Sequence, residues 1–165
     1  MKINNCVIIP ITELSDIDKV MILDWRNHDN IRKWMYNSSF ISKVSHFKFI
    51  ENLKTDRNNE YFLVEQNSIK IGVIYFNKID FINKSAYFGL YVNPLEKSRG
   101  KGSKLIELSI KYAFEKLELR MLKLEVFNTN EIAINLYHKF NFNVITKKKV
   151  NNNTIIRMEL KNENR

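Results

Sequence analysis

Within residues 90–106, LYVNPLEKSRGKGSKLI, a strand pattern passes into a helix pattern. The apolar strand residues end before Pro94, and the helical spacing begins near Gly102. Gly100 and Gly102, two of the chain's four glycines, lie in the connecting loop, and residues 97–104 carry four cations. The N-terminus of a helix offers free backbone N–H donors and a partial positive charge. This loop is therefore predicted to bind a phosphate or pyrophosphate.

The alternative is a basic turn in which glycine serves the backbone geometry alone. The order of residues matches neither the Walker loop nor the three-glycine dinucleotide fingerprint. The loop alone does not decide between these two interpretations, so the rest of the chain must.

The length and composition favour one globular domain over residues 1–165. A chain of this size buries roughly 70% of its surface, and 44% hydrophobic with 12% aromatic residues argues against disorder. The single cysteine, Cys6, excludes an internal disulfide and a cysteine-cluster metal site, and fits a reducing compartment. No stretch approaches the roughly 20 apolar residues that span a membrane, so we expect a soluble, cytoplasmic protein.

The net charge of +9 has two interpretations. It favours a polyanionic partner, which would be nucleic acid, a membrane or a phosphorylated small molecule. Alternatively, most of the lysines form a solvated surface, because only residues 97–104 and 147–149 are densely basic. No residues of a known nucleic-acid-binding module are present. We therefore expect neither nucleic acid nor a membrane as partner.

Apolar periodicity predicts a mixed order of strands and helices. The predicted strands are residues 6–11, 61–65, 70–79, 85–92, 122–127, 142–150 and 154–160. The predicted helices are residues 15–36, 43–54, 102–117 and 131–140, the first starting at Ser15 or Asp16. No repeat, linker or change in composition divides the chain.

In this context, residues 90–106 resemble motif A of the GNAT superfamily of N-acetyltransferases, in which a strand and a turn precede Gln/Arg-x-x-Gly-x-Gly/Ala. The motif here reads Lys97-x-x-Gly100-x-Gly102, with lysine at the first position. Residues 126–142, VFNTNEIAINLYHKFNF, are similar to a later helix of the family. The resemblance implies a single-domain α/β fold with a central, mixed, mostly antiparallel sheet flanked by helices. It also implies that this sheet splays between strands 85–92 and 122–127.

The same resemblance implies acetyl-coenzyme A as co-substrate, with its pyrophosphate on the loop and its pantetheine arm along strand 85–92. The residues implied to bind it are Leu90, Tyr91, Val92, Lys97, Ser98, Arg99, Gly100, Lys101, Gly102, Ser103, Asn130 and Tyr137. Asn130 also suits a simple helix N-cap. Gly89 suits either a bulge in the strand or close packing.

The catalytic expectations concern two residues. Tyr137 matches the family's catalytic tyrosine, which protonates the leaving thiolate; a structural core tyrosine is the alternative. Glu125 is the candidate base, acting directly or through water, although an exposed cross-strand glutamate explains it equally well. Backbone N–H groups of residues 90–92 are the expected oxyanion donors. The three histidines lie far apart in sequence with no matching carboxylates, so no metal is expected.

The acceptor expectation comes from a narrower resemblance, to the nucleotide-linked aminosugar N-acetyltransferases of pseudaminic acid biosynthesis. Four short motifs carry it: Arg26-Asn27-His28, Trp34-Met35-Tyr36, Ser45-His46-Phe47 and Asn77-Lys78-Ile79. That family acetylates the 4-amino group of UDP-linked 4-amino-4,6-dideoxy-N-acetyl-altrosamine. By this resemblance Arg26, His46 and Lys78 engage the phosphates and base of the nucleotide. Met35, Tyr36 and Tyr91 line the nucleotide and sugar pocket.

Two other functions remain open at this point. An acetyltransferase acting on protein N-termini, of the ribosomal-protein type, shares a similar start to the first helix. A non-catalytic module that binds coenzyme A or nucleic acid belongs to a different class, and Tyr137 and the absence of a nucleic-acid motif argue against it. The oligomeric state is also open, with a homodimer among the alternatives.

Overall fold

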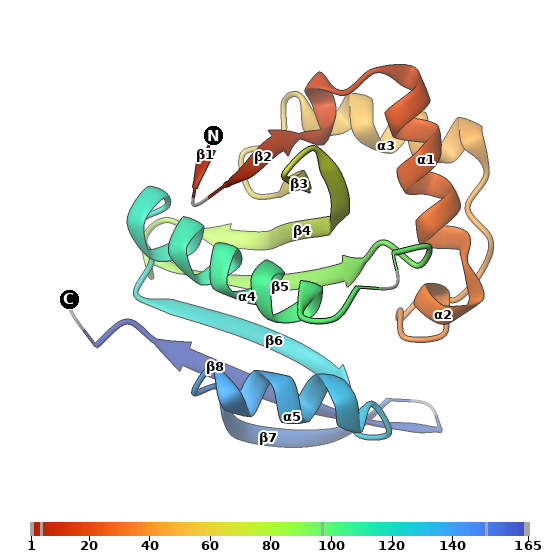
Figure 1. The fold of residues 1–165 in the computed structure, drawn as a ribbon. Helices are drawn as coiled ribbons and strands as arrows, with labels where there is room; N and C mark the ends of the chain where they lie inside the picture. Colours follow the sequence, from red (N-terminus) through yellow and green to blue (C-terminus); the bar gives the residue numbers. More distant parts are fainter. Residues whose placement is uncertain (1, 4, 97, 151, 164–165) are drawn as a thin grey trace.

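One eight-stranded sheet organises the chain in the computed structural model, which describes residues 2–3, 5–96, 98–150 and 152–163 (Figure 1). The strands are β1 (Lys2–Ile3), β2 (Cys6–Pro10), β3 (Glu60–Gln66), β4 (Ile69–Asp80), β5 (Ser85–Val92), β6 (Met121–Phe127), β7 (Asn143–Val150) and β8 (Asn153–Lys161). They lie in the order β1-β2-β3-β4-β5-β6-β8-β7, and only β5 and β6 pair in parallel among the described strands. The mixed, mostly antiparallel sheet is confirmed.

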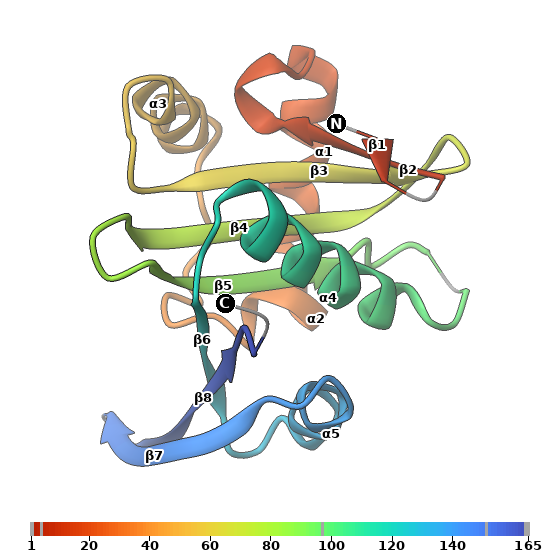
Figure 2. The ribbon, with the colours of Figure 1, turned by 90° about the vertical axis from the view of Figure 1, so that its left-hand side faces the viewer.

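The helices cover both faces of this sheet. They are α1 (Asp16–Asn27), α2 (Asp29–Arg32), α3 (Lys43–Leu53), α4 (Lys101–Lys111) and α5 (Glu131–Lys139), with a 3-10 turn at Ile11–Glu13 and a π-helical turn at Tyr112–Lys116. Figure 2 shows α4 in front of the sheet and α1 behind it. None of the helices in the described ranges is long and apolar enough to cross a membrane.

The sheet opens between β5 and β6, as the resemblance implied. These strands pair only where Ser85–Tyr87 lies beside Met121–Lys123. Beyond Tyr87, β5 continues to Val92 while β6 diverges toward β8, a divergence visible in Figure 1. The edge of β5 that faces the opening is therefore free to bond to a ligand.

Strand alternation divides the buried side chains between two cores. Phe88 on β5 and Leu124 on β6 belong to the larger core, which α4 and α5 cover. Val73 on β4 and Leu63 on β3 belong to the smaller core, which packs against α1 and α3. The sheet thus separates two helical layers.

Side-chain caps explain where several helices begin. The Ser15 side chain accepts a hydrogen bond from the Asp18 N–H at 3.2 Å, which confirms the predicted start of α1. Residues 15–36, predicted to be largely helical, are helical from Asp16 to Arg32 but form two helices and not one. At His28 the backbone is extended, with ψ of 136°, and the His28 ring accepts a bond from the Asn30 N–H, so a new helix starts there.

The structure decides between the two explanations of Gly89, a bulge in the strand and close packing. The ladder between β4 and β5 runs regularly through Gly89, and its register shift lies between Asn77 and Asp80. A Cβ added to Gly89 would overlap the ring of Tyr75. Close packing of this ring against the strand, and not a bulge, explains the glycine.

Candidate functional site

A groove of about 640 Å³ lies in the opening between β5 and β6. Of the residues expected to bind the co-substrate, those that line it are Leu90, Tyr91, Val92, Gly100, Gly102, Ser103, Asn130 and Tyr137. Ser98, Arg99 and Lys101 do not line it, and Lys97 lies outside the described residues. The groove therefore joins the strand edge, the start of α4 and the face of α5.

The start of α4 presents backbone to the groove. Gly100 is the N-cap residue and has a φ of +85°, a backbone conformation that residues other than glycine rarely adopt. Two lysines of this turn already bond to other side chains. The Lys101 Nζ donates to the Gln66 Oε1 at 3.0 Å, and the Lys104 Nζ pairs with the Glu107 carboxylate at 3.0 Å. Binding of an anion here would thus depend on the backbone N–H groups and the helix dipole more than on these lysines.

Gly102 lets α4 approach α5. An added Cβ would lie 3.1 Å from the Leu136 Cδ2 on α5, closer than an ordinary contact. Asn130 begins α5, and its side chain accepts a bond from the Ala133 N–H at 3.3 Å while also lining the groove. The cap explanation for Asn130 is therefore compatible with a place in the groove.

Tyr137 faces the groove from α5. Its ring packs edge-on against Phe88, with centroids 6.0 Å apart, and against Phe142 at 5.8 Å. Burial raises the pKa of the Tyr137 hydroxyl to about 12. The hydroxyl has no hydrogen-bond partner among the residues that the structure describes. Because its pKa is raised, the hydroxyl is protonated at neutral pH, and because it has no partner, its O–H group can donate to a bound molecule.

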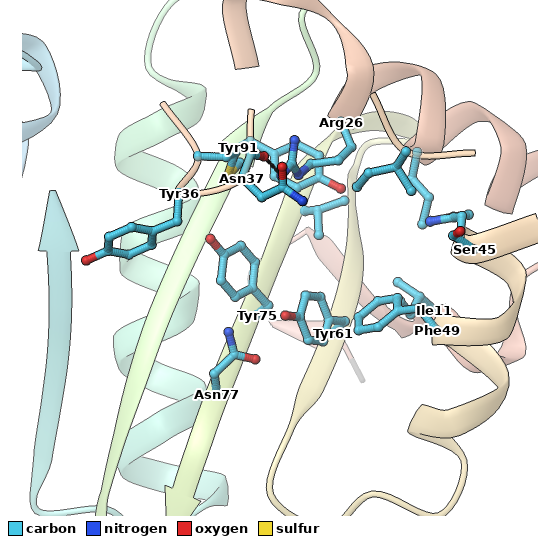
Figure 3. A pocket seen from close by; sticks show the side chains of 15 residues that line it. Ile11, Arg26, Tyr36, Asn37, Ser45, Phe49, Tyr61, Tyr75, Asn77 and Tyr91 are labelled. Carbon is cyan, nitrogen blue, oxygen red and sulfur yellow. Dashed lines mark hydrogen bonds between the residues drawn. The ribbon is translucent and has the colours of Figure 1, made fainter. Parts of the chain in front are cut away.

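A second cavity, of about 400 Å³, lies beside the groove on the α1 and α3 side of the sheet (Figure 3). Met35, Tyr75 and Tyr91 line both cavities and form their shared wall. Of the residues expected to bind the acceptor, Arg26, Met35, Tyr36, His46 and Tyr91 line this cavity. Two substrates bound in these neighbouring cavities would meet at the shared wall.

Arg26 gives the second cavity a partly buried positive charge. Its Nη2 donates to the Asn37 carbonyl oxygen at 2.9 Å, whereas its Nη1 is buried and has no hydrogen-bond partner within the described part of the chain. Burial lowers the pKa of Arg26, although the nearby hydroxyls of Tyr91 and Tyr75 oppose that shift. No aspartate or glutamate lines the cavity among the described residues. This environment suits an anionic ligand and not a polyamine.

The other two expected nucleotide ligands differ from Arg26. The His46 Nε2 lies 2.9 Å from the Lys19 carbonyl oxygen, and burial lowers the pKa of His46, so the ring is neutral at neutral pH. Lys78 is exposed and outside the cavity, with its Nζ 5.6 Å from the centroid of the Tyr87 ring. Neither arrangement brings a second positive charge into the cavity.

The aromatic wall of this cavity was not predicted from the sequence. The Tyr61 and Tyr75 rings stack with centroids 4.9 Å apart, and Phe49 packs edge-on against Tyr61. Asn77, Asn37 and Ser45 add polar groups to the lining. Tyr61 and Tyr75 are direct partners in the β3–β4 ladder, but this pairing depends on the register shift between Val64 and Glu65. A regular register extended from the turn would oppose Tyr61 to Ile74, so the sequence did not reveal the pair.

Glu125, the candidate base, lines the groove, but both of its carboxylate oxygens already have partners. Its Oε2 accepts a hydrogen bond from the Tyr36 hydroxyl, and its Oε1 lies 3.0 Å from the Lys148 Nζ and 3.1 Å from the Arg157 Nη2. Burial alone would raise the pKa of Glu125, but these three bonds together lower it. A carboxylate held in this way is a weak base.

Comparisons with known proteins agree with this geometry. The model of the acetyltransferase (GNAT) family matches residues 20–142. The acetyltransferase PseH of Campylobacter jejuni is 38% identical over 138 residues, which cover 84% of this chain and 85% of that protein.

Solved structures are also similar. The crystal structure of Campylobacter jejuni N-acetyltransferase PseH in complex with acetyl coenzyme A has a TM-score of 0.77 and 33% identity, covering 94% of this chain and 98% of that one. A Vibrio cholerae spermidine N-acetyltransferase in complex with CoA and spermine has a TM-score of 0.86 at 22% identity, covering 96% of each chain. The second likeness shows the fold alone.

Proposed function

The chain belongs to the GNAT family of acetyl-coenzyme A-dependent N-acetyltransferases, and we propose that its acceptor is a UDP-linked aminosugar. The substrate would be UDP-4-amino-4,6-dideoxy-N-acetyl-β-L-altrosamine, acetylated on its 4-amino group in pseudaminic acid biosynthesis. The observation that carries the proposal is the buried, unpaired Nη1 of Arg26 in an aromatic cavity of the described residues that shares a wall with the groove. The similarity to PseH supports the same substrate class.

The groove fits acetyl-coenzyme A. Its pyrophosphate would lie at the start of α4, where Gly100 leaves open space and the backbone N–H groups are free. The amide groups of the pantetheine arm would bond to the edge of β5 beyond Tyr87, which no described strand covers. The co-substrate supplies the activated acetyl group.

The reaction would proceed by direct attack. The neutral 4-amino group attacks the thioester carbonyl carbon, and the carbon–sulfur bond then breaks. Backbone N–H groups of residues 90–92 would donate to the carbonyl oxygen as charge develops there. Tyr137 would donate its proton to the departing thiolate sulfur. The proton of the amine would pass to water, because Glu125 is held as a paired carboxylate.

The acceptor cavity would recognise the nucleotide through charge and stacking. The Nη1 of Arg26 would donate to a phosphate oxygen, a charge-assisted bond that satisfies its buried donor. The stacked pair Tyr61 and Tyr75 offers an apolar wall to the sugar or base. A polyamine or an N-terminal amine would bring positive charge beside Arg26 without a carboxylate on the wall to balance it.

A thiol-release assay with acetyl-coenzyme A tests the proposal. The panel should contain UDP-aminosugars that differ in the position of the amine, peptides with free N-termini, and spermidine. We expect the UDP-4-aminosugar to be the fastest acceptor. A faster rate with a peptide or with spermidine would contradict the proposed substrate class.

A further inference from the structure

The connection between α2 and α3, residues 33–42, forms a strap at the mouth of the open sheet. Side chains of α1 and α2 bond to the backbone of residues 37–41 and hold the strap to the N-terminal half of the chain. The Asn27 side chain makes two hydrogen bonds with the backbone of Ile41, at 2.9 and 2.8 Å. The Arg26 Nη2 bonds to the Asn37 carbonyl oxygen at 2.9 Å, and the Arg32 Nη1 bonds to that of Ser38 at 3.3 Å.

The middle of the strap reaches the other half of the sheet. In Figure 3 the Tyr36 ring points away from Arg26 and toward β6, the cyan strand on the left. This ring packs against Phe127 on β6, with centroids 6.0 Å apart, and its hydroxyl donates to Glu125. Lys148 on β7 and Arg157 on β8 hold the second oxygen of Glu125. The strap therefore bridges the two arms that diverge beyond Tyr87.

The same strap builds walls of both cavities. Trp34 and Met35 line the groove, whereas Met35, Tyr36 and Asn37 line the acceptor cavity. Movement of the strap away from β6 would remove one wall of the acceptor cavity and open the place where the two substrates meet.

We propose that Glu125 is a positioning residue that latches the strap through Tyr36, and that it does not remove the proton of the acceptor amine. Both of its oxygens are already bonded, and only 15% of its side chain is exposed. Burial raises the pKa of Tyr36, and the bond to Glu125 raises it further, which keeps the Tyr36 hydroxyl protonated as a donor. The inference rests on the proposed function only in placing an acceptor amine at the shared wall.

Three variants separate the two roles. Glu125→Gln still offers an amide that bonds to the Tyr36 hydroxyl, but it cannot act as a base. We expect its kcat to fall less than about threefold, whereas loss of a general base costs roughly 10²–10⁴-fold. Glu125→Ala and Tyr36→Phe break the latch and should each raise the KM for the acceptor roughly tenfold. The double variant should be no worse than Glu125→Ala alone, because Glu125→Ala already removes the bond that Tyr36→Phe breaks.

The fluorescence of Trp34, which lies in the strap, reports the exposure of the strap without requiring turnover. Trp25 is 3% exposed and Trp34 is 37% exposed, so acrylamide quenching of the two tryptophans reads mainly the strap. Quenching should increase in Tyr36→Phe and Glu125→Ala and stay at the wild-type level in Glu125→Gln, with melting temperatures showing that each variant is folded. A large loss of kcat in Glu125→Gln at unchanged acceptor KM would overturn the proposal, as would unchanged quenching in Tyr36→Phe. If no UDP-aminosugar is acetylated, the proposed function fails, but the quenching comparison still tests the latch.

Discussion

Tyr137 combines an apolar ring environment with a hydroxyl that faces the groove. Its ring explains why the alternative of a core tyrosine was reasonable from the sequence. The buried hydroxyl of a purely structural tyrosine usually has a hydrogen-bond partner. The Tyr137 hydroxyl has none among the described residues, so a structural role alone does not account for it. The two roles are therefore carried by different atoms of one side chain.

The variant Tyr137→Phe tests the proton-donor role. It keeps the ring contacts with Phe88 and Phe142, so the fold and both KM values should change little. The kcat should fall roughly 10²–10⁴-fold, the usual worth of general acid catalysis. Steady-state kinetics at saturating substrates measures this, and a variant with the wild-type kcat would remove Tyr137 from the mechanism.

The pH dependence has a definite sign at this residue. A general acid must be protonated, so its contribution is present below its pKa and lost above it. Because burial raises the pKa of Tyr137 to about 12, kcat should show no alkaline fall up to pH 10, the ordinary pKa of tyrosine. A loss of kcat centred near pH 8 that is absent from Tyr137→Phe would assign the residue a much lower pKa.

Arg26 tests the anionic part of the acceptor. Lysine cannot reproduce the planar fork of donors, so Arg26→Lys should lose both the bond to the Asn37 carbonyl and the Nη1 donor. We expect the KM for the UDP-aminosugar to rise roughly tenfold, about 1.4 kcal/mol, with the affinity for acetyl-coenzyme A unchanged. The matched control is Arg57→Lys at an exposed position. Equal effects of the two substitutions would contradict a specific role for Arg26.

At the scale of elements, α4 can reach the groove because Gly102 lets it pack closely on α5. A larger residue must displace Leu136 or shift the first turn of α4, and the free N–H groups would move with that turn.

Gly102→Val should therefore raise the dissociation constant of acetyl-coenzyme A about tenfold or more, which corresponds to about 1.4 kcal/mol. Gly102→Ala should have a smaller effect, because its single Cβ meets only the end of the Leu136 side chain at 3.1 Å. Isothermal titration calorimetry measures both values, with circular dichroism as the control for folding. Wild-type affinity in a folded Gly102→Val variant would exclude the start of α4 as the pyrophosphate site.

The sequence predicted most elements because local signals determine them. Alternation identified the strands, and Ser15 identified the start of α1. The break at His28 was missed because apolar residues continue beyond it, and only the extended backbone of this residue ends the helix. The short strand β1 has no periodic pattern that could reveal it.

The site was less predictable, because it depends on long-range packing. A motif fixed the positions of Gly100 and Tyr137, and both line the groove. Pairing across the sheet decides the surroundings of Glu125, whose partners lie on β7, β8 and the strap. The exposure of Lys78 likewise follows from the register shift between Asn77 and Asp80, which the sequence does not reveal.

In the whole molecule, the proposed direct attack would use two adjoining cavities and the Tyr137 hydroxyl, with no metal ion. The described residues contain no group of three histidine, cysteine, aspartate or glutamate side chains that could hold a metal. We therefore expect the rate to be unchanged after dialysis against EDTA. Activity that EDTA abolishes and one divalent ion restores would require a different mechanism.

We expect the cavity around Arg26 to bind the nucleotide of the acceptor and the groove to bind acetyl-coenzyme A. The inhibition pattern of free UDP tests this assignment of the two cavities, because UDP carries the nucleotide and diphosphate but no amine. UDP should compete with the UDP-aminosugar and should not compete with acetyl-coenzyme A. Competition with acetyl-coenzyme A, or no inhibition at concentrations well above the KM of the aminosugar, would contradict the claim.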